Sequence, residues 1–161
     1  MSNGQGANKI DYDRIFMSAA LELAKQSAAE GEVPVGAVIV RNGEIVSTGR
    51  NRRESDKNAI VHAELQAIDR ACSALGGWRL WECELYVTME PCPMCAGAII
   101  NSRIKRVVFG AYDSKAGSCG SVINLFDLPY NHKPELTGGY MEKECSAILT
   151  EFFKELRKKK K

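Results

Sequence analysis

The chain has 161 residues, of which 45% are hydrophobic and 26% charged, as in a soluble globular protein. Six irregularly spaced cysteines exclude the disulfide framework of a small secreted protein, and a net charge of +2 points to no particular class of partner. No apolar run reaches the ~20 residues that cross a bilayer, and the first residues lack the apolar segment of a signal peptide. We therefore expect a cytoplasmic protein without a membrane span, formed by one domain over residues 1–161 with a loose N-terminus at about 1–10 and a basic tail at about 158–161.

The first expected element is a helix that runs from about residue 12 to Glu30, with Asp11 as its N-cap and Gly31 after its end. The residues expected to form its apolar stripe are Ile15, Phe16, Ala19 and Leu23. The segments VGAVIV and EIVSTG then flank Asn42-Gly43. This pattern predicts a β-hairpin, because both positions of an Asn-Gly turn tolerate a positive φ angle.

A second helix is expected from about Val61 to Leu75, because apolar residues recur there at helical spacing and Gly76 ends the pattern. The residues expected on its apolar face are Leu65, Ile68, Cys72 and Leu75. A short strand over 85–89 follows. A third helix is expected from Pro93 to about residue 102, since proline at a first helical position loses no hydrogen bond.

The C-terminal third begins with RVVFGA, residues 106–111, which predicts another strand. Residues 113–134 are irregular, with a short helix expected near 121–126. A final helix carries its apolar stripe on Cys145, Ile148, Leu149, Phe152 and Leu156. A hairpin followed by strands that alternate with helices predicts an α/β fold, in which helices cover both faces of a sheet.

Two cysteines three positions apart, in the stretch TMEPCPMCAG, are the strongest candidates for chemistry. If a helix begins at Pro93, Cys92 caps it and Cys95 lies in its first turn, so their sulfurs can converge on one side. The helix dipole there favours thiolates over thiols. This arrangement suits a divalent metal, although the spacing alone leaves a thioredoxin-like redox pair open.

A histidine supplies the third ligand. His62, in VHAEL, gives together with Cys92 and Cys95 one nitrogen and two sulfur ligands. A structural zinc site is usually closed by four protein ligands, whereas a catalytic one keeps a place for water, so three ligands indicate catalysis. Glu64 is not expected to bind the same ion, but it lies close enough to take a proton from a water there.

These residues carry a resemblance to a known family. HAE at 62–64 and PCPMC at 91–95 form the paired signature of the cytidine-deaminase-like zinc deaminases, a signature already described for nucleobase deaminases. Longer segments resemble the bacterial tRNA-specific adenosine deaminases (TadA type) over about residues 12–157, among them EVPVGAVIV, LYVTMEPCPMCAGAII, SRIKRVVFGAYDSKAGSCGS and ECSAILTEFF. The resemblance implies a three-layer α/β/α sandwich with a mixed five-stranded sheet of the cytidine-deaminase-like type.

The resemblance also implies an activity. The enzyme would be a homodimer that converts the wobble adenosine of a tRNA anticodon stem-loop to inosine, with one Zn²⁺ per subunit held by His62, Cys92 and Cys95 and with Glu64 as the proton shuttle. The residues that it assigns to the substrate are Asn51 at the purine, Glu32, Val33 and Pro34 in the pocket wall, Asp113 beside the RNA backbone, and Asn131 and His132 at the mouth of the site. For His132, an ordinary surface-loop histidine remains the alternative.

Two positions depart from the family pattern. Arg53 stands where proline usually follows the Asn-Arg pair, and Ala59-Ile60-Val61 replaces a Pro-Thr-Ala-like run before His62. These departures leave the metal chemistry intact but affect the shape of the pocket. Two other interpretations stay open: a deaminase of a free nucleobase or nucleoside of the guanine or cytosine type, and a non-catalytic zinc module with a fourth protein ligand.

Overall fold

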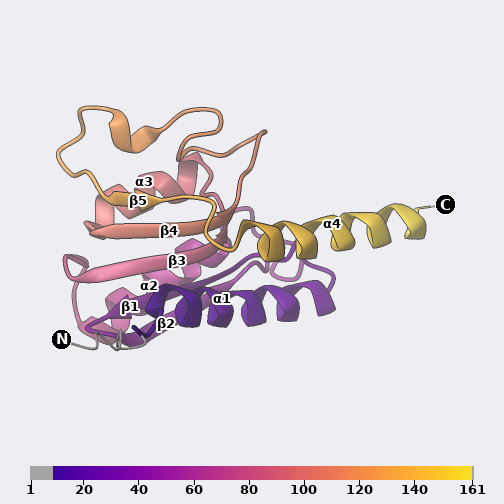
Figure 1. Cartoon of the computed structure of the whole chain (residues 1–161), viewed down its shortest axis with the longest axis horizontal. Helices are drawn as coiled ribbons and strands as arrows, with labels where there is room; N and C mark the ends of the chain where they lie inside the picture. The colour runs from indigo at the N-terminus through magenta and orange to yellow at the C-terminus, as the bar shows by residue number, and fades with distance from the viewer. Residues whose placement is uncertain (1–8, 161) are drawn as a thin grey trace, which may run out of the picture.

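The computed structural model describes residues 9–160, so the loose N-terminus expected at about 1–10 lies mostly outside the described residues (Figure 1). The elements in chain order are α1 (Tyr12–Ala29), β1 (Gly36–Arg41), β2 (Glu44–Arg50), α2 (Ala63–Leu75), β3 (Cys83–Met89), α3 (Pro93–Ser102), β4 (Arg106–Ala111), the 3₁₀ turn η1 (Leu125–Asp127), β5 (Glu135–Thr137) and α4 (Glu142–Lys159). Among these described elements, none is a helix long and apolar enough to cross a membrane.

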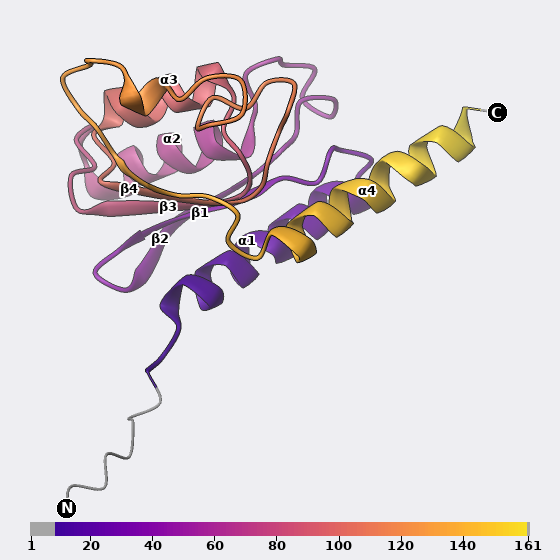
Figure 2. The same cartoon turned by 45° about the horizontal axis from the view of Figure 1, so that its top comes forward.

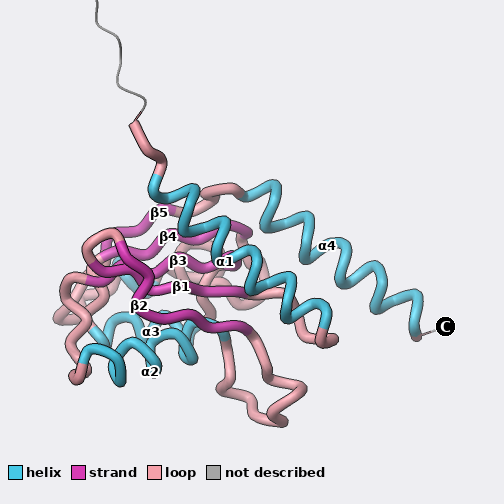
Figure 3. The backbone as a smooth tube through the Cα atoms, turned by 90° about the horizontal axis from the view of Figure 1, so that it is seen from below, coloured by secondary structure: helices cyan, strands magenta, loops and turns pink. Residues whose placement is uncertain are grey.

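The sheet has five strands in the order β2-β1-β3-β4-β5. β1 pairs antiparallel with both β2 and β3, whereas β3–β4 and β4–β5 are parallel. Figure 3 shows α1 and α4 on one face of this sheet and α2 and α3 on the other. The predicted mixed sheet between two helix layers is therefore confirmed.

Strand residues alternate between the two helix layers, as the two-residue period of a strand requires. On β1, Ala37 and Ile39 pack toward α2 and α3, while Val38 and Val40 pack toward α1 and α4. β3 and β4 repeat the alternation, which gives the sheet two separate hydrophobic cores. The parallel strands are thus buried on both faces, as is usual when crossover helices cover a sheet.

The residues that α1 and α2 bury differ in part from the predicted apolar stripes, and several of them are alanines. On α1 the buried residues include Met17, Ala20 and Ala24, whereas Ile15 is 52% exposed. On α2 they include Ala63, Ala67 and Ala71, while Leu65, Cys72 and Leu75 are only partly buried. The alanines let the helix backbones approach the sheet closely, while Ile15, Leu65 and Leu75 lie at the margins of the contacts.

The C-terminal half of α4 extends past the end of the sheet (Figures 1 and 2). Cys145 and Leu149, in its first half, are buried as predicted. Leu156, which the predicted stripe also included, is 37% exposed, because there is no sheet beneath this part of the helix. The overhanging half therefore presents an apolar stripe and the basic residues of the chain end to its surroundings.

Candidate active site

Two helix starts meet at one end of the sheet. His62 is the N-cap of α2, Cys92 is the N-cap of α3, and Cys95 lies in the first turn of α3, which Pro93 begins. Gly49 on β2 allows α2 to sit this close, since a Cβ at that position would overlap the Ala63 carbonyl. The hairpin and β3 thereby hold the three predicted ligands side by side.

The three side chains are spaced for one tetrahedral metal ion. The Sγ atoms of Cys92 and Cys95 each lie 3.6 Å from Nδ1 of His62, and the three ligand atoms lie within 4.8 Å of one another. For zinc with Zn–S of ~2.3 Å and Zn–N of ~2.05 Å, tetrahedral angles would place the nitrogen about 3.6 Å from each sulfur. The residues therefore fit zinc, and within residues 9–160 no fourth His, Cys, Asp or Glu joins the group.

The electrostatics of the two cysteines also favour a cation. The hydrogen bond from Cys95 lowers the pKa of Cys92 to about 4, and the same bond together with burial raises the pKa of Cys95. The contact with Cys92 in turn raises the pKa of His62. The lowered pKa of Cys92 favours its thiolate form, and binding of a metal would displace the protons that remain on the other ligand side chains.

Glu64 lies two residues after His62, in the first turn of α2, and is 4% exposed. Burial raises the pKa of its carboxyl group to about 7, and its carboxylate accepts a hydrogen bond from Cys95. A group that titrates near neutral pH can both accept and donate a proton under working conditions. The structure thus places a general acid–base group beside the metal-binding side chains without making it a ligand.

A cavity of ≈ 180 Å³ opens over His62, Glu64 and Cys92. Its remaining lining residues are Val33, Val35, Asn51, Arg53, Ala63, Met89, Glu90 and Asp113. This volume is below the roughly 300–1,000 Å³ of sites for drug-sized ligands, so it suits one small planar group. The arrangement brings together three side chains that can hold a metal ion, a buried carboxyl group that can exchange protons, and a small cavity above them.

Comparison with known proteins agrees with this geometry. The model of the cytidine and deoxycytidylate deaminase zinc-binding region matches residues 10–111. The tRNA-specific adenosine deaminase of Bacillus subtilis (strain 168) is 51% identical over 153 residues, which cover 94% of this chain and 95% of that protein. The chain belongs to this zinc-dependent deaminase family, in the branch of the tRNA-specific adenosine deaminases.

Two solved structures place this deaminase more closely. One, from studies of A-to-I editing by tRNA:A34 deaminases at the wobble position of transfer RNA, has a TM-score of 0.82 and 41% identity and covers 84% of this chain and 99% of its own. A guanine deaminase from Bacillus subtilis has a TM-score of 0.61 and 36% identity and covers 74% of this chain and 80% of its own. Of these two structures, the tRNA-editing one covers more of this chain and has the higher TM-score.

Among the predicted substrate residues, the structure places three on the cavity wall of the deaminase: Val33, Asn51 and Asp113. The Asn51 amide donates to the Val33 carbonyl (3.1 Å) and accepts from the Arg53 backbone N–H (3.2 Å). One amide proton and one lone pair remain available for a ligand. The Asp113 carboxylate accepts from the backbone N–H groups of Lys115 (3.0 Å) and Ala116 (3.2 Å), which fixes the turn that follows it.

Glu32 and Pro34, which were expected in the pocket wall, are not among the residues that line the cavity. Glu32 is fully buried, and its carboxylate accepts hydrogen bonds from the backbone N–H groups of Glu54 (3.1 Å) and Ser55 and from the Ser55 hydroxyl (2.9 Å). It therefore anchors the loop between β2 and α2. The Glu32 carboxylate is thus engaged by this loop instead of lining the cavity, and its contact with a base stays a prediction.

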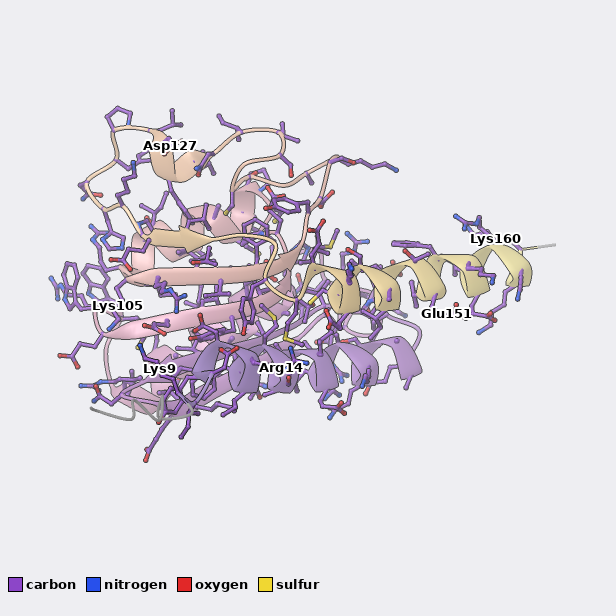
Figure 4. The ribbon with its side chains drawn as sticks, viewed as in Figure 1. Lys9, Arg14, Lys105, Asp127, Glu151 and Lys160 are labelled. Atoms are coloured by element: carbon purple, nitrogen blue, oxygen red, sulfur yellow. The ribbon has the colours of Figure 1, made fainter. Side chains whose placement is uncertain are left out.

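Asn131 and His132 lie far from the mouth of the site. The His132 ring contacts the Ile104 carbonyl at 2.7 Å and packs edge-on against Trp81, next to the residues where β4 begins. Figure 4 shows the neighbouring Lys105 at the end of the sheet opposite to the tip of α4, whereas the cavity lies where β3 ends. The alternative of a surface-loop histidine is the one that this placement supports.

Arg53, Met89 and Glu90 line the cavity without having been predicted to do so. Arg53 had only been noted as a departure from the family pattern. The sequence did contain one feature that could have predicted Glu90 at the cavity. Glu90 stands between a strand and the Pro91-Cys92 pair, so its side chain must lie near the metal ligands. Glu90 is buried. No periodicity in the sequence predicts this burial, since the hydrogen-bond partners of its carboxylate come from a loop more than 20 residues away.

Proposed function

We propose that this chain hydrolyses adenosine to inosine and ammonia at the wobble position of a tRNA anticodon, with one Zn²⁺ per subunit. The observation that carries the proposal is the convergence of His62, Cys92 and Cys95 next to buried Glu64 under a cavity of single-base size. The names of the relatives, tRNA-specific adenosine deaminases, support the choice of substrate. A cytoplasmic location is part of this proposal, and a tRNA substrate supports it.

The chemistry follows from the positions of these side chains. A zinc ion held by the three ligands would lower the pKa of water to about 7 and so supply a nucleophile at neutral pH. Glu64 accepts the proton of the attacking water and transfers it to N1 of the adenine, which makes C6 electrophilic. After water has added at C6, Glu64 takes the proton of the new C6 hydroxyl and delivers it to the exocyclic amine. The C6–N bond then breaks, the C6 carbonyl of inosine forms, and the amine leaves as ammonia. Glu64 thus serves first as base and then as acid.

An RNA strand can leave this cavity along a basic groove. Asp113 lines the cavity, and two residues later Lys115 lines a groove beside α4 together with Phe153, Arg157 and Lys160. Cationic side chains contact phosphates, and exposed aromatic side chains stack with unpaired bases. An anticodon-loop base is already unpaired, so turning it into the cavity costs less than extruding it from a duplex.

The homodimer expected from the resemblance is part of this proposal. The sequence of α3, PMCAGAIINS, carries no charged residue, although the helix lies in an outer layer of the fold. In the loop after β4, Val122 is 62% and Ile123 43% exposed. Burial of such apolar surface against a second copy would stabilise a dimer. Sedimentation equilibrium of the purified chain tests this, because a monomer at micromolar concentration would contradict it.

The decisive experiment compares substrates. The zinc-loaded protein is incubated with unmodified tRNA transcripts, with free adenosine and with the free bases guanine and cytosine, while ammonia release and inosine at the first anticodon position are measured. We expect inosine in at least one tRNA and little ammonia from the small substrates. Fast release of ammonia from guanine with no inosine in any transcript would instead support a free-base deaminase, which the similarity to a guanine deaminase keeps as the second candidate.

A further inference from the structure

Glu90 is a buried carboxylate that the reaction does not use. It follows the last residue of β3 and precedes the ligand Cys92 by two positions, and it is 3% exposed on the wall of the cavity. It does not belong to the metal-binding group. An ionised carboxylate is buried at a large cost unless hydrogen bonds satisfy it, so its partners must explain its presence.

All of its hydrogen-bond partners come from the loop between β4 and η1. Oε1 accepts from the Asp113 backbone N–H (3.1 Å) and from the Ser121 hydroxyl. Oε2 accepts from the backbone N–H groups of Cys119 (3.1 Å) and Ser121 (3.0 Å). One side chain therefore gathers both ends of the 113–121 loop.

The loop also packs tightly over this carboxylate. A Cβ atom at Gly117 would overlap the carboxyl group of Glu90, so only glycine allows the backbone to lie there. The Ser118 N–H donates to the Pro91 carbonyl (2.8 Å), which ties the loop to the segment that carries Cys92. The position of the loop is thus defined relative to the metal ligands.

This loop carries the residues that face the substrate on one side of the cavity. Asp113 lies on the cavity wall and Lys115 lies in the groove beside α4. We propose that Glu90 is a positioning residue, whose carboxylate fixes the 113–121 loop so that the base and the RNA strand next to it are held over the metal site. The inference rests on the proposed function, because it assigns the RNA-binding wall of the same site.

The chemistry of the four donors defines the variant that tests this. Glu90→Gln keeps the size of the side chain, but its amide offers one acceptor oxygen and turns an NH₂ group toward donors that need an acceptor. Hydrogen bonds to a charged group are stronger than neutral ones, so the neutral amide of Glu90→Gln should hold the loop donors less strongly. We therefore expect the 113–121 loop to detach locally in this variant. Ser121→Ala is the matched control, since it removes one hydroxyl donor and keeps the three backbone donors.

Three measurements are made on each zinc-loaded variant: zinc per chain, KM and kcat for an anticodon stem-loop, and hydrogen exchange of the 113–121 amides. For Glu90→Gln we expect full zinc content, KM raised about 10–100-fold with kcat changed less than about 5-fold, and faster exchange confined to this loop. For Ser121→Ala we expect a KM change below about 3-fold. A purely structural role would lower the fraction of folded enzyme without raising KM.

Loss of zinc from Glu90→Gln, or faster exchange with unchanged KM, would overturn the inference. If Glu90→Gln does not fold, Gly117→Ala tests the same loop without removing the charge, and Gly77→Ala, where an added Cβ has no neighbour within 4 Å, is its control. If KM rises for Gly117→Ala but not for Gly77→Ala, the inference is supported. Equal KM values for the two glycine variants overturn it. A wild-type protein that forms no inosine refutes the proposed function, and unchanged exchange in Glu90→Gln then refutes the role of Glu90 separately.

Discussion

Replacement of Glu64 by glutamine should change activity and stability in opposite directions. Glutamine has nearly the same shape as glutamate, so Glu64→Gln keeps the packing of a side chain that is 4% exposed. It cannot carry a proton between water, the ring nitrogen and the leaving amine. Because Glu64 is not one of the metal ligands, the variant should retain one zinc per chain.

The expected loss of activity is large. General acid–base catalysis by a positioned side chain contributes about 10²–10⁴-fold, and here one side chain serves two proton transfers. We therefore expect kcat to fall by about 10³-fold or more, which corresponds to roughly 4 kcal/mol in the activation free energy. KM for the anticodon stem-loop should change little, since the walls of the cavity stay in place.

The expected change in stability follows from the pKa of Glu64. Burial raises that pKa from 4.5 to about 7, so the folded protein binds this proton more tightly than the unfolded chain. The carboxyl group therefore destabilises the zinc-free fold progressively as pH rises from about 4.5 to 7, by at most about 3 kcal/mol above pH 7. After zinc is removed with a chelator, Glu64→Gln should be more stable than wild type at pH 8 and no more stable at pH 4.5.

Urea denaturation of the chelated proteins at both pH values measures this difference, and metal analysis with single-turnover kinetics of the zinc-loaded proteins measures the rest. Turnover of Glu64→Gln within 10-fold of wild type would refute the role of Glu64 as proton carrier. Loss of zinc would show that the carboxylate supports the metal site instead. If wild type and Glu64→Gln are equally stable at pH 8, the argument that burial raises the pKa of Glu64 is refuted. The catalytic assignment of Glu64 would not be affected.

Three further outcomes test other parts of the structure. Cys95→Ala should lose bound zinc and all deamination, whereas Cys145→Ala, at a buried position of α4 away from the metal ligands, should keep both; metal content per chain distinguishes them. Asp13→Asn should lower the free energy of unfolding by about 2–3 kcal/mol, because Asp13 accepts two hydrogen bonds from Arg106 (3.0 and 2.8 Å), and thermal denaturation should show a Tm lower by roughly 4–12 °C. Since the Arg106 hydrogen bond lowers the pKa of Asp13, that difference should shrink as pH falls below about 4, and a constant difference would contradict the assignment. Lys115→Glu should raise KM for tRNA about 10-fold and reduce the slope of log KM against log salt by about 1. If the variant and the wild type have the same KM at every salt concentration, Lys115 makes no phosphate contact.

Local patterns in the sequence were sufficient to predict most elements. The hairpin around Asn42-Gly43 and the helix beginning at Pro93 are present because turn and cap preferences act over a few residues. The three metal ligands could also be proposed, since each lies at the start of a helix and next to other residues of the signature. β5 has only three residues and pairs solely with β4, so its sequence carries no strand pattern of its own.

The contacts of the substrate residues were predicted less well, because they depend on how loops fold back onto the sheet. Glu32 was expected in the pocket wall, yet its carboxylate is taken up by the backbone around Ser55. His132 follows the loop after β4, but that loop crosses to the far end of the sheet before β5 begins. No local pattern encodes either path, since both depend on partners more than 20 residues away.

The two sides of the cavity are built in the same way, and this separates catalysis from recognition. Glu32 anchors the loop that brings Arg53 to the cavity, and Glu90 anchors the loop that brings Asp113 to it. Each is a buried carboxylate that accepts backbone N–H groups and a serine hydroxyl from its loop. The metal ligands, in contrast, sit on helix starts packed against the sheet, so a change in either loop can alter which base or strand is accepted while the metal site keeps its geometry. That division predicts that variants of the two anchors will change KM before they change zinc binding.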